Sequence, residues 1–387
     1  MTFKQLTTND ITNTRTLLHE AIPLTGTIVS GTYGTFRSEG NIKNYNHGMF
    51  QSVYDYPYLS SSANHIFDIT LGVSTHSTLY SNLALSTAGQ QSKKKNMYNQ
   101  MAQILMGFDH TGSVLRFDQD GDLLAGGEKL DSCFILPMAR LLAKDEIKKE
   151  SFSLELGVNY LFTEPFSKTI TISDVSASNE YRVNSPVGEY GILYATSSVQ
   201  TTNKTLLDRA NTNKVTMNGH NYWYAGLIFY QAGIVVLTGS VFGSLLNSNA
   251  TTGVGSADGV EFCRSGFLGA TGGTQLENVL TASQITSSAN MFRNRIKNLQ
   301  FNNTTELNST VYFCRANHNE FNYSSNPTYL QSSKIRVKTV ATDNPVSYIT
   351  TVGLYNDKNE LLATAKLSEP LKKDPTTEFT IRARLDY

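Results

Sequence analysis

The sequence of 387 residues has little charge, and none in excess. Charged residues make up 17% of the chain, against roughly 25% in an average soluble domain. Lys and Arg number 32, and so do Asp and Glu. A chain without net charge lacks the positive field that concentrates a protein on nucleic acid. We therefore expect no nucleic-acid partner.

Cysteine is also scarce. Cys133, Cys263 and Cys314 are the three in the chain, and they lie far apart. An odd and sparse set does not form a disulfide framework, and it fits free thiols in a reducing compartment. The first ten residues lack the apolar core of a signal peptide, so we expect no secretory leader.

Long hydrophobic runs are almost missing. Residues 222–243 carry no charge and are about as long as a bilayer span. However, Gln231 and three glycines interrupt this stretch, which mixes aromatic and β-branched residues. We interpret it as two buried strands, 222–230 and 234–238, joined around residues 231–233. This interpretation is favoured over a membrane helix, so no membrane insertion is expected.

The clearest positive pattern lies near the end of the sequence. Five apolar residues occupy every second position there: Phe379, Ile381, Ala383, Leu385 and Tyr387. A period of two places them on one face of a β-strand. Residues 346–354 and 361–367 alternate in the same way around the turn residues 356–359, which predicts a hairpin.

Similar patterns predict sheet elsewhere and a few helices. Strand-like pieces are expected at residues 152–162, 168–174 and 190–199, and at 114–124 as a hairpin. Helices are expected at residues 7–22, where Thr7 and Asp10 have capping-box spacing, and at 93–105, 201–212 and 275–299. The predicted fold is mainly β and resembles a β-sandwich of antiparallel sheets, with α+β as the second choice.

A charged run at residues 144–150 gives the predicted domain boundary. Residues 1–150 would form a mixed N-terminal domain that includes an arm-like segment rich in aromatic residues. Residues 151–387 would form a β-rich domain with a helical insertion near 275–299.

One acidic segment invites a metal-binding interpretation: Asp118, Asp120 and Asp122 are carboxylates at alternate positions. Such spacing can wrap a calcium ion. However, Leu123 stands where a calcium loop needs glycine, and Lys129 stands where it needs a bidentate glutamate. We favour an Asp-Gly turn at the tip of a hairpin.

Catalytic patterns are not found. The seven histidines show no zinc-site spacing, and the glycine-rich residues 266–274 lack the lysine of a phosphate loop. No nucleophile elbow occurs. We therefore expect a non-enzymatic protein, and we assign no catalytic, metal-binding or cofactor-binding residues and no cofactor.

Two aromatic segments are candidates for contact with partners. Residues 41–72 are dense in Tyr and Phe without a clear period, so they should be buried in the protein's own core or against a neighbour. Residues 322–329 are polar apart from Tyr323 and Tyr329, which flank Asn326-Pro327. They would form either a docking loop for another subunit or a packed loop at the end of the sheet.

Four segments carry a resemblance to a known class of proteins: residues 14–29, 48–68, 313–329 and 352–368. In these segments the chain resembles virion structural proteins of large contractile-tailed bacteriophages, of the kind found in tail baseplates. The resemblance implies a wedge-type subunit that assembles with itself and with other tail proteins. It also implies synthesis in the host cytoplasm and a final location in the virion tail.

Alternative functions remain open beside this one. A receptor- or glycan-binding module of the tail could use the aromatic residues within 45–58 or 321–329. A neck, collar or head-associated structural protein is a further alternative. A polysaccharide depolymerase is disfavoured because no pair of carboxylates stands out.

Overall fold

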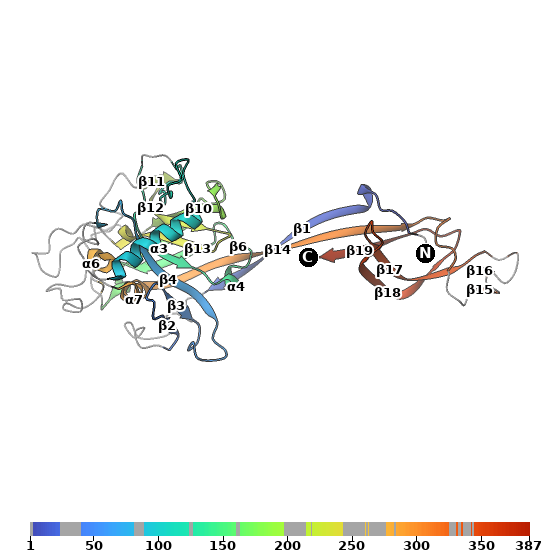
Figure 1. Cartoon of the computed structure of the whole chain (residues 1–387), viewed down its shortest axis with the longest axis horizontal. Helices are drawn as coiled ribbons and strands as arrows, with labels where there is room; N and C mark the ends of the chain where they lie inside the picture. Colours follow the sequence, from blue (N-terminus) through green and yellow to red (C-terminus); the bar gives the residue numbers. More distant parts are fainter. Residues whose placement is uncertain are drawn as a thin grey trace, which may run out of the picture. The chain divides into compact units, whose positions relative to one another are not determined.

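The computed structural model describes most of the chain (Figure 1). The described residues are 3–23, 40–80, 89–123, 127–159, 163–196, 214–217, 219–242, 260, 262, 276–281, 284–324, 330–331, 334–335, 342 and 344–387. They belong to two compact units. Unit 1 comprises Met1–Leu18 and Glu306–Tyr387, and unit 2 comprises His19–Thr305.

Unit 2 is built on one large antiparallel sheet. Its strand order is β14-β7-β8-β10-β12-β13-β5-β4-β3-β2, with β6 on β14, β9 on β10 and β11 on β12. The bounds are β2 Ile42–Asn44, β3 Gln51–Tyr54, β4 His65–Val73, β5 Ser132–Pro137, β6 Glu146–Ile147, β7 Ser153–Gly157, β8 Thr169–Ser173, β9 Arg182–Ser185, β10 Gly188–Thr196, β11 Lys214–Met217, β12 His220–Phe229, β13 Ile234–Thr238 and β14 Ile296–Ala316. The mainly β prediction, with antiparallel sheets and a few helices, is confirmed.

The central strands of this sheet are buried on both faces, and their side chains alternate between two cores. In β5, Phe134 and Leu136 join the larger core, while Cys133 and Ile135 join the smaller one. Neighbouring β13 does the same, with Val236 on the side of the smaller core. Because successive side chains of a strand point to opposite faces, one sheet can support a core on each side.

Helix α3 (Gly89–Leu105) covers the smaller core and confirms the helix predicted at 93–105. Gly72 of β4 permits this packing, because a Cβ at this position would lie 2.8 Å from the Tyr98 Cα. Tyr98 also donates a hydrogen bond from its hydroxyl to the Leu130 carbonyl, at 2.9 Å. The helix is therefore held by packing and by a buried polar contact.

Two helices pack into the larger core: α6 (Leu276–Thr281) and α7 (Ile285–Arg293). Phe292 of α7 stacks on Phe134, with ring centroids 4.6 Å apart. The single helix predicted at 275–299 is therefore wrong, because β14 already begins at Ile296. Short helical turns are α4 Arg140–Ala143, η3 Pro165–Ser167 and η4 Gly239–Phe242.

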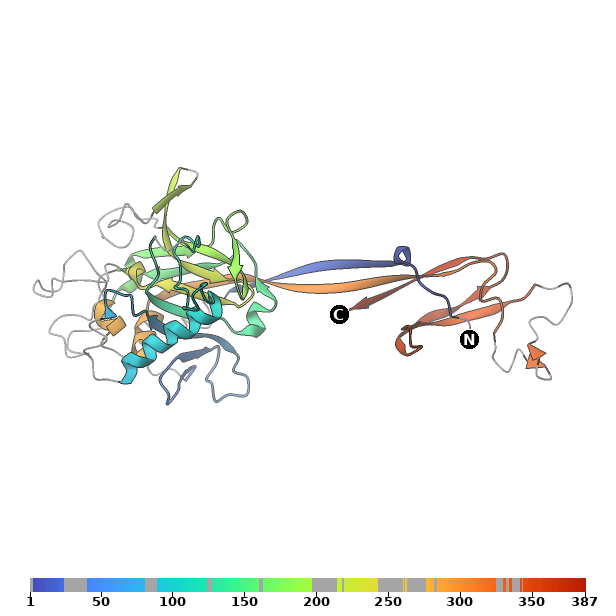
Figure 2. The same ribbon diagram turned by 45° about the horizontal axis from the view of Figure 1, so that its top comes forward.

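Unit 1 contains the remaining described strands. They are β15 Leu330–Gln331, β16 Lys334–Ile335, β17 Ser347–Tyr355, β18 Leu361–Lys373 and β19 Phe379–Asp386. β17 and β18 form the predicted hairpin, and β19 pairs antiparallel with residues 309–316 of β14. Figure 2 shows these strands in orange and red.

The structure corrects the prediction for the N-terminal segment. Thr7 and Asp10 do form the capping box, but the 3-10 turn η1 ends at Asp10, and β1 (Ile11–Pro23) comes next. β1 lies beside β14 in the sheet order. Pairing with a neighbouring strand therefore overrides a local helix-start signal.

Two further predictions differ from the structure. Within the described residues 114–123 no strand forms, and that segment makes only single bridges, at Val114 and Asp118. The charged run 144–150 lies inside unit 2, where β6 pairs with β14, so the division into units does not fall at residue 150. A run of charges marks an exposed segment, and here that segment is still paired in the sheet.

The hairpin predicted in the uncharged stretch is confirmed: β12 and β13 pair antiparallel around residues 230–233. Among the described helices, none is both long and apolar enough to cross a membrane. The predictions for residues 201–212, 266–274 and 325–329 lie outside the described residues.

Candidate functional site

One face of the β14–β19 pair in unit 1 is the first candidate. In the antiparallel register Tyr312 lies opposite Ala383, Cys314 opposite Ile381, and Thr310 opposite Leu385. Because cross-strand partners share a face, seven apolar side chains line it: Ala316 and Ala383 are buried, and five are only half-buried. We call these five the β14–β19 apolar face: Tyr312, Cys314, Phe379, Ile381 and Leu385.

The chain itself leaves this face only partly covered. All five side chains are half-buried, and none belongs to either hydrophobic core. Among the described residues of unit 1, Val311, Ala316 and Ala383 are the buried apolar ones. Ordering a residue costs roughly 1–2 kcal/mol in conformational entropy, so a unit of this size needs far more apolar burial to be stable by itself.

The β17–β18 hairpin is exposed to a similar degree. Tyr348 is 56% exposed and Leu362 is 67% exposed. Among the described strands, β17 and β18 pair only with each other. An open two-stranded hairpin is marginal in water, which indicates that this part of unit 1 also lacks a neighbour.

The other face of the β14–β19 pair is charged with both signs. Arg384 donates from Nε to Asp386 Oδ1 at 2.6 Å, and Arg315 Nε lies 3.0 Å from Asp10 Oδ1. A hydrogen bond from the Ser309 hydroxyl, and then the Arg384 guanidinium, lower the pKa of the Asp386 carboxyl. The Thr7 side chain does most to lower the pKa of Asp10. This face therefore carries exposed ion pairs beside the buried side chain of Val311.

A buried ammonium organises the neighbouring loop. The Lys373 side chain is fully buried, and its Nζ donates to Asn322 Oδ1 at 2.7 Å, to the Asp374 carbonyl at 2.8 Å and to the His318 carbonyl at 3.2 Å. These contacts fix the beginning of the segment for which a docking loop or a packed loop is predicted. Phe321 and Tyr323 stay exposed there, at 37% and 52%.

The aromatic segment of unit 2 is the second candidate. Tyr45 stacks on the His47 ring at 5.1 Å, and Lys43 Nζ lies 4.9 Å from the Tyr45 ring centroid. In contrast, Tyr56 is 58% exposed and Tyr58 is 37% exposed. Phe67 lies in the protein's own core, which confirms that alternative for it, whereas for Tyr56 and Tyr58 burial against a neighbour stays a prediction.

The acidic loop is the third candidate, and its three carboxylates do gather. Asp118, Asp120 and Asp122 offer ligand atoms within 4.8 Å of one another. However, Lys129 Nζ lies 2.7 Å from Asp118 Oδ1, and the Leu123 amide donates to Asp118 Oδ2 at 2.6 Å. Both members of the ion pair are buried, with the Asp118 side chain 1% and the Lys129 side chain 9% exposed. The ammonium therefore supplies a positive charge where a metal ion would bind.

The acidic loop also shares a backbone feature with calcium loops. Leu123 has φ 60°, so it adopts the left-handed conformation that a calcium loop requires of its glycine. Burial is the main cause that raises the pKa of Asp118, and the contact with Lys129 opposes it. The sequence identifies the two positions that depart from a calcium loop, but not that Lys129 reaches back to the first carboxylate.

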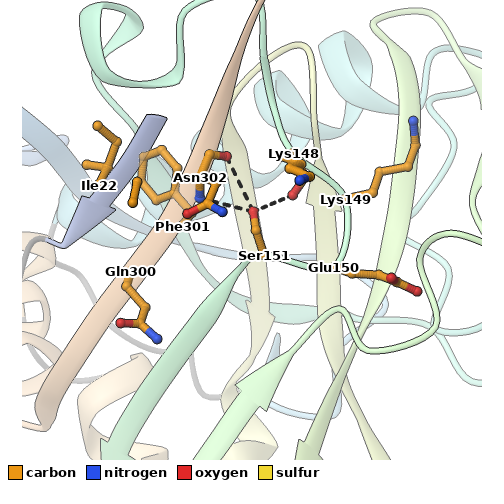
Figure 3. Close-up of a pocket in the computed structure, with 9 residues that line it drawn as sticks. Ile22, Lys148, Lys149, Glu150, Ser151, Gln300, Phe301 and Asn302 are labelled. Atoms are coloured by element: carbon orange, nitrogen blue, oxygen red, sulfur yellow. Dashed lines mark hydrogen bonds between the residues drawn. The ribbon is translucent and has the colours of Figure 1, made fainter. Parts of the chain in front are cut away.

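A cavity of about 470 Å³ lies in unit 2 between β1, β14 and the segment before β7. Ser151 lies at its centre in Figure 3: its hydroxyl donates to the Lys148 carbonyl and accepts from the Asn302 amide at 3.0 Å. Lys149 pairs with Glu189 instead. Since the serine hydroxyl bonds backbone groups, and no histidine is among the described residues that line the cavity, these residues do not form a nucleophile–base pair.

No family model, curated protein or solved structure matches this chain. The candidates for a site are therefore defined by geometry alone. They are a partly uncovered apolar face in unit 1, an exposed aromatic pair in unit 2 and an acidic loop that is neutralised by its own lysine.

Proposed function

We propose that the chain is a non-enzymatic structural subunit of a contractile-tailed phage virion, placed in the tail baseplate as a wedge-type component. The observation that carries the proposal is the shortage of core in unit 1. Tyr312, Ile381 and Leu385 alternate as in a buried strand, yet they stay half-exposed. Side chains of this kind gain most of their stabilisation by packing against a neighbouring protein.

The sequence resemblance supplies the identity of the assembly, and the surface supports the general role. Aromatic residues are enriched at protein interfaces, and unit 1 exposes Tyr323, Tyr348 and Tyr387. A baseplate part must keep its shape under load and exchange neighbours when the tail contracts. Partly polar contacts around aromatic anchors suit that task better than a fully apolar interface.

The test is to locate the protein in particles. Mass spectrometry of purified virions should detect its peptides, and gold-labelled antibodies should mark the baseplate end of the tail. Label at the head or the collar would overturn the baseplate location. Absence from virions, or turnover of a polysaccharide by the purified protein, would overturn the structural role.

A second candidate function is recognition of a surface glycan, and the exposed rings of Tyr56 and Tyr58 favour it. Sugar rings stack on exposed aromatic faces, and such sites add hydrogen-bonding groups beside the ring. Asn64 and Asp55 provide these groups close to the two tyrosines in the chain, with Asn64 Nδ2 donating to Asp55 Oδ2 at 2.8 Å. The protein as purified would then bind a glycan array, and the double substitution Tyr56→Ala/Tyr58→Ala would abolish the binding, whereas Tyr348→Ala in unit 1 would not.

A further inference from the structure

We infer that the outer face of β2, β3 and β4 in unit 2 is a binding site for a saccharide that carries a negative charge. The inference rests on the second candidate function, glycan recognition, and deepens it by naming the class of sugar and the residues that lie beside Tyr58. We call this surface the polar-aromatic face, and it consists of Lys43, Tyr45, Tyr54, Tyr58, His65 and Asp68.

The pairing of the three strands determines which side chains share this face. Lys43 of β2 lies opposite Ser52 of β3, and Ser52 lies opposite Asp68 of β4. The neighbouring row of the register points into the larger core instead: Ile42, Val53 and Phe67. Because adjacent strands are about 4.8 Å apart, Lys43 and Asp68 stand roughly 10 Å apart, with β3 between them.

An irregularity in the pairing adds His65 to the same face. Val53 lies opposite Phe67, but the next residue, Tyr54, lies opposite His65, so the register shifts by one residue. A β-bulge of this kind re-aims a side chain. His65 and Asp68 are three residues apart and would point to opposite faces of a regular strand. Here His65 Nε2 lies 2.8 Å from Asp68 Oδ1, so the bulge brings the two side chains together.

The His65–Asp68 pair offers polar groups to a ligand. Asp68 Oδ1 contacts His65 and accepts a hydrogen bond from the Ser52 hydroxyl, whereas Asp68 Oδ2 has no hydrogen bond among the described contacts. Both side chains are partly exposed, at 35% for His65 and 24% for Asp68. A carboxylate oxygen beside an imidazole nitrogen can bind the hydroxyl groups of a sugar.

Three tyrosine rings supply the apolar part of the polar-aromatic face. The Tyr54 ring centroid lies 6.3 Å from that of Tyr58 and 5.5 Å from that of His65. Tyr45 is held at the face because its hydroxyl accepts a hydrogen bond from Ser52 at 3.3 Å. None of the three tyrosines is a described member of either hydrophobic core, and each is exposed or half-buried. Their rings therefore provide surfaces on which a sugar can stack.

Lys43 indicates the charge of the ligand. Its Nζ lies 4.9 Å from the Tyr45 ring centroid and 5.9 Å from the Tyr58 ring centroid, so two rings hold the ammonium in place. Among the described residues it forms no ion pair with a carboxylate. The charge of Asp68 is largely screened, because it lies farther away than the Debye length of about 8 Å. The ammonium is therefore available to a carboxylate or phosphate group on the sugar.

A glycan array tests the class of ligand directly. The full chain is applied to sialylated and uronic-acid glycans, to phosphodiester-linked teichoic acid polymers and to neutral glycans. We expect binding to charged glycans that is about tenfold or more stronger than binding to neutral ones, because only the former offer Lys43 a charged partner. Carboxyl reduction of a bound acidic glycan should weaken its binding by a similar factor. The charged class that binds, carboxylated glycan or teichoic acid, identifies the source of the charge.

The matched variants are Lys43→Gln and Lys95→Gln, since Lys95 is another half-buried lysine of unit 2, in α3. Lys43→Gln should bind the charged glycan about tenfold more weakly and lose the preference over neutral glycans, whereas Lys95→Gln should bind as the wild type does. The single tryptophan, Trp223, lies in β12 of unit 2, so its fluorescence checks that unit 2 remains folded in each variant.

The outcomes separate this inference from the second candidate function. Neutral glycans that bind through Tyr56 and Tyr58 without any preference for charge would support glycan recognition and overturn the charged ligand. A preference for charged glycans that persists in Lys43→Gln would overturn the assignment of this face. Absence of binding to every glycan on the array would overturn both, and the location of the protein in virions would still test the structural role by itself.

Discussion

Unit 2 and unit 1 are both made of antiparallel strands, but they differ in how completely the chain buries its own apolar residues. In unit 2 the strands β10, β12, β13 and β5 are covered on both faces. In unit 1 the strands have the same alternation of apolar and polar residues, yet the apolar side chains remain half-exposed.

The difference between the units shows what an alternating sequence pattern determines and what it leaves open. Alternation fixes which side chains share a face of a strand, as the register of β14 with β19 confirms. It does not state which element covers that face. In unit 2 helices of the same chain cover the sheet, and in unit 1 we propose that a neighbouring protein covers it.

The largest expected effect is a loss of folding stability caused by a substitution in the buried core of unit 2. Phe134 stacks on Phe292 and meets the edge of Phe242, with the latter centroids 6.1 Å apart. Phe134→Ala should lower the free energy of unfolding by about 3–5 kcal/mol, because it removes buried contacts and leaves a cavity. Denaturant unfolding followed by Trp223 fluorescence measures the effect. A loss below about 1 kcal/mol would contradict the description of this core.

The acidic loop provides a second test within unit 2. Lys129→Met should lower the free energy of unfolding by about 3 kcal/mol, since it leaves the buried Asp118 carboxylate without its cation. The loss should shrink as the pH falls, because a protonated Asp118 needs no counter-charge. The same unfolding measurement at several pH values checks this, with the exposed pair Lys297–Glu155 as control: Lys297→Met should cost less than about 1 kcal/mol.

A pH effect of intermediate size is expected from Lys94 of α3. Its Nζ donates to the Leu280 and Thr281 carbonyls at 2.7 and 3.1 Å, and burial lowers its pKa to about 7. Between pH 7 and the ordinary lysine pKa of 10.5, the unfolded chain holds a proton that the folded chain has released, so stability should rise with pH. Between pH 7 and pH 9.5 the gain is on the order of 3 kcal/mol.

Lys94→Met should remove this slope. Unfolding free energies of wild type and Lys94→Met between about pH 7 and pH 9.5 provide the measurement. Equal slopes in the two proteins would show that Lys94 does not titrate in this range.

The smallest effect on unit 2 is expected from a change in unit 1. Phe379→Ala removes a half-exposed ring from the β14–β19 apolar face, outside both cores. The unfolding transition seen by Trp223 should shift by less than about 0.5 kcal/mol. A large shift in the Trp223 transition would mean that the two units do not unfold independently.

Much of the fold can be predicted from the sequence, because strands with a strict period of two leave few alternatives. Such patterns predict the β17–β18 hairpin and β19, and an uncharged stretch interrupted around Gln231 predicts the β12–β13 hairpin; all three are confirmed. The helix predicted from residue 7 is wrong because Thr7 and Asp10 form a capping box within a turn that ends before β1. A local cap fixes one turn, and pairing with the partner strand decides the conformation beyond it.

The candidate site is less accessible to prediction, because it depends on the residues that lie opposite each side chain. The alternation in residues 379–387 identifies the face, but it does not indicate that Ile381 and Leu385 stay half-exposed. The ion pair of Asp118 with Lys129 occurs together with a left-handed backbone at Leu123, a residue type that seldom adopts this conformation. A leucine at position 123 therefore does not indicate in the sequence that the backbone is left-handed there.

The loop that ends in Lys129 carries its own counter-ion. An ammonium on the polypeptide cannot be chelated, diluted or exchanged for another ion, so this turn keeps its shape in any ionic medium that leaves the protein folded. A single-nucleotide change that converts this lysine codon to one for glutamate would reverse that independence, and the turn would then depend on divalent cations from its surroundings.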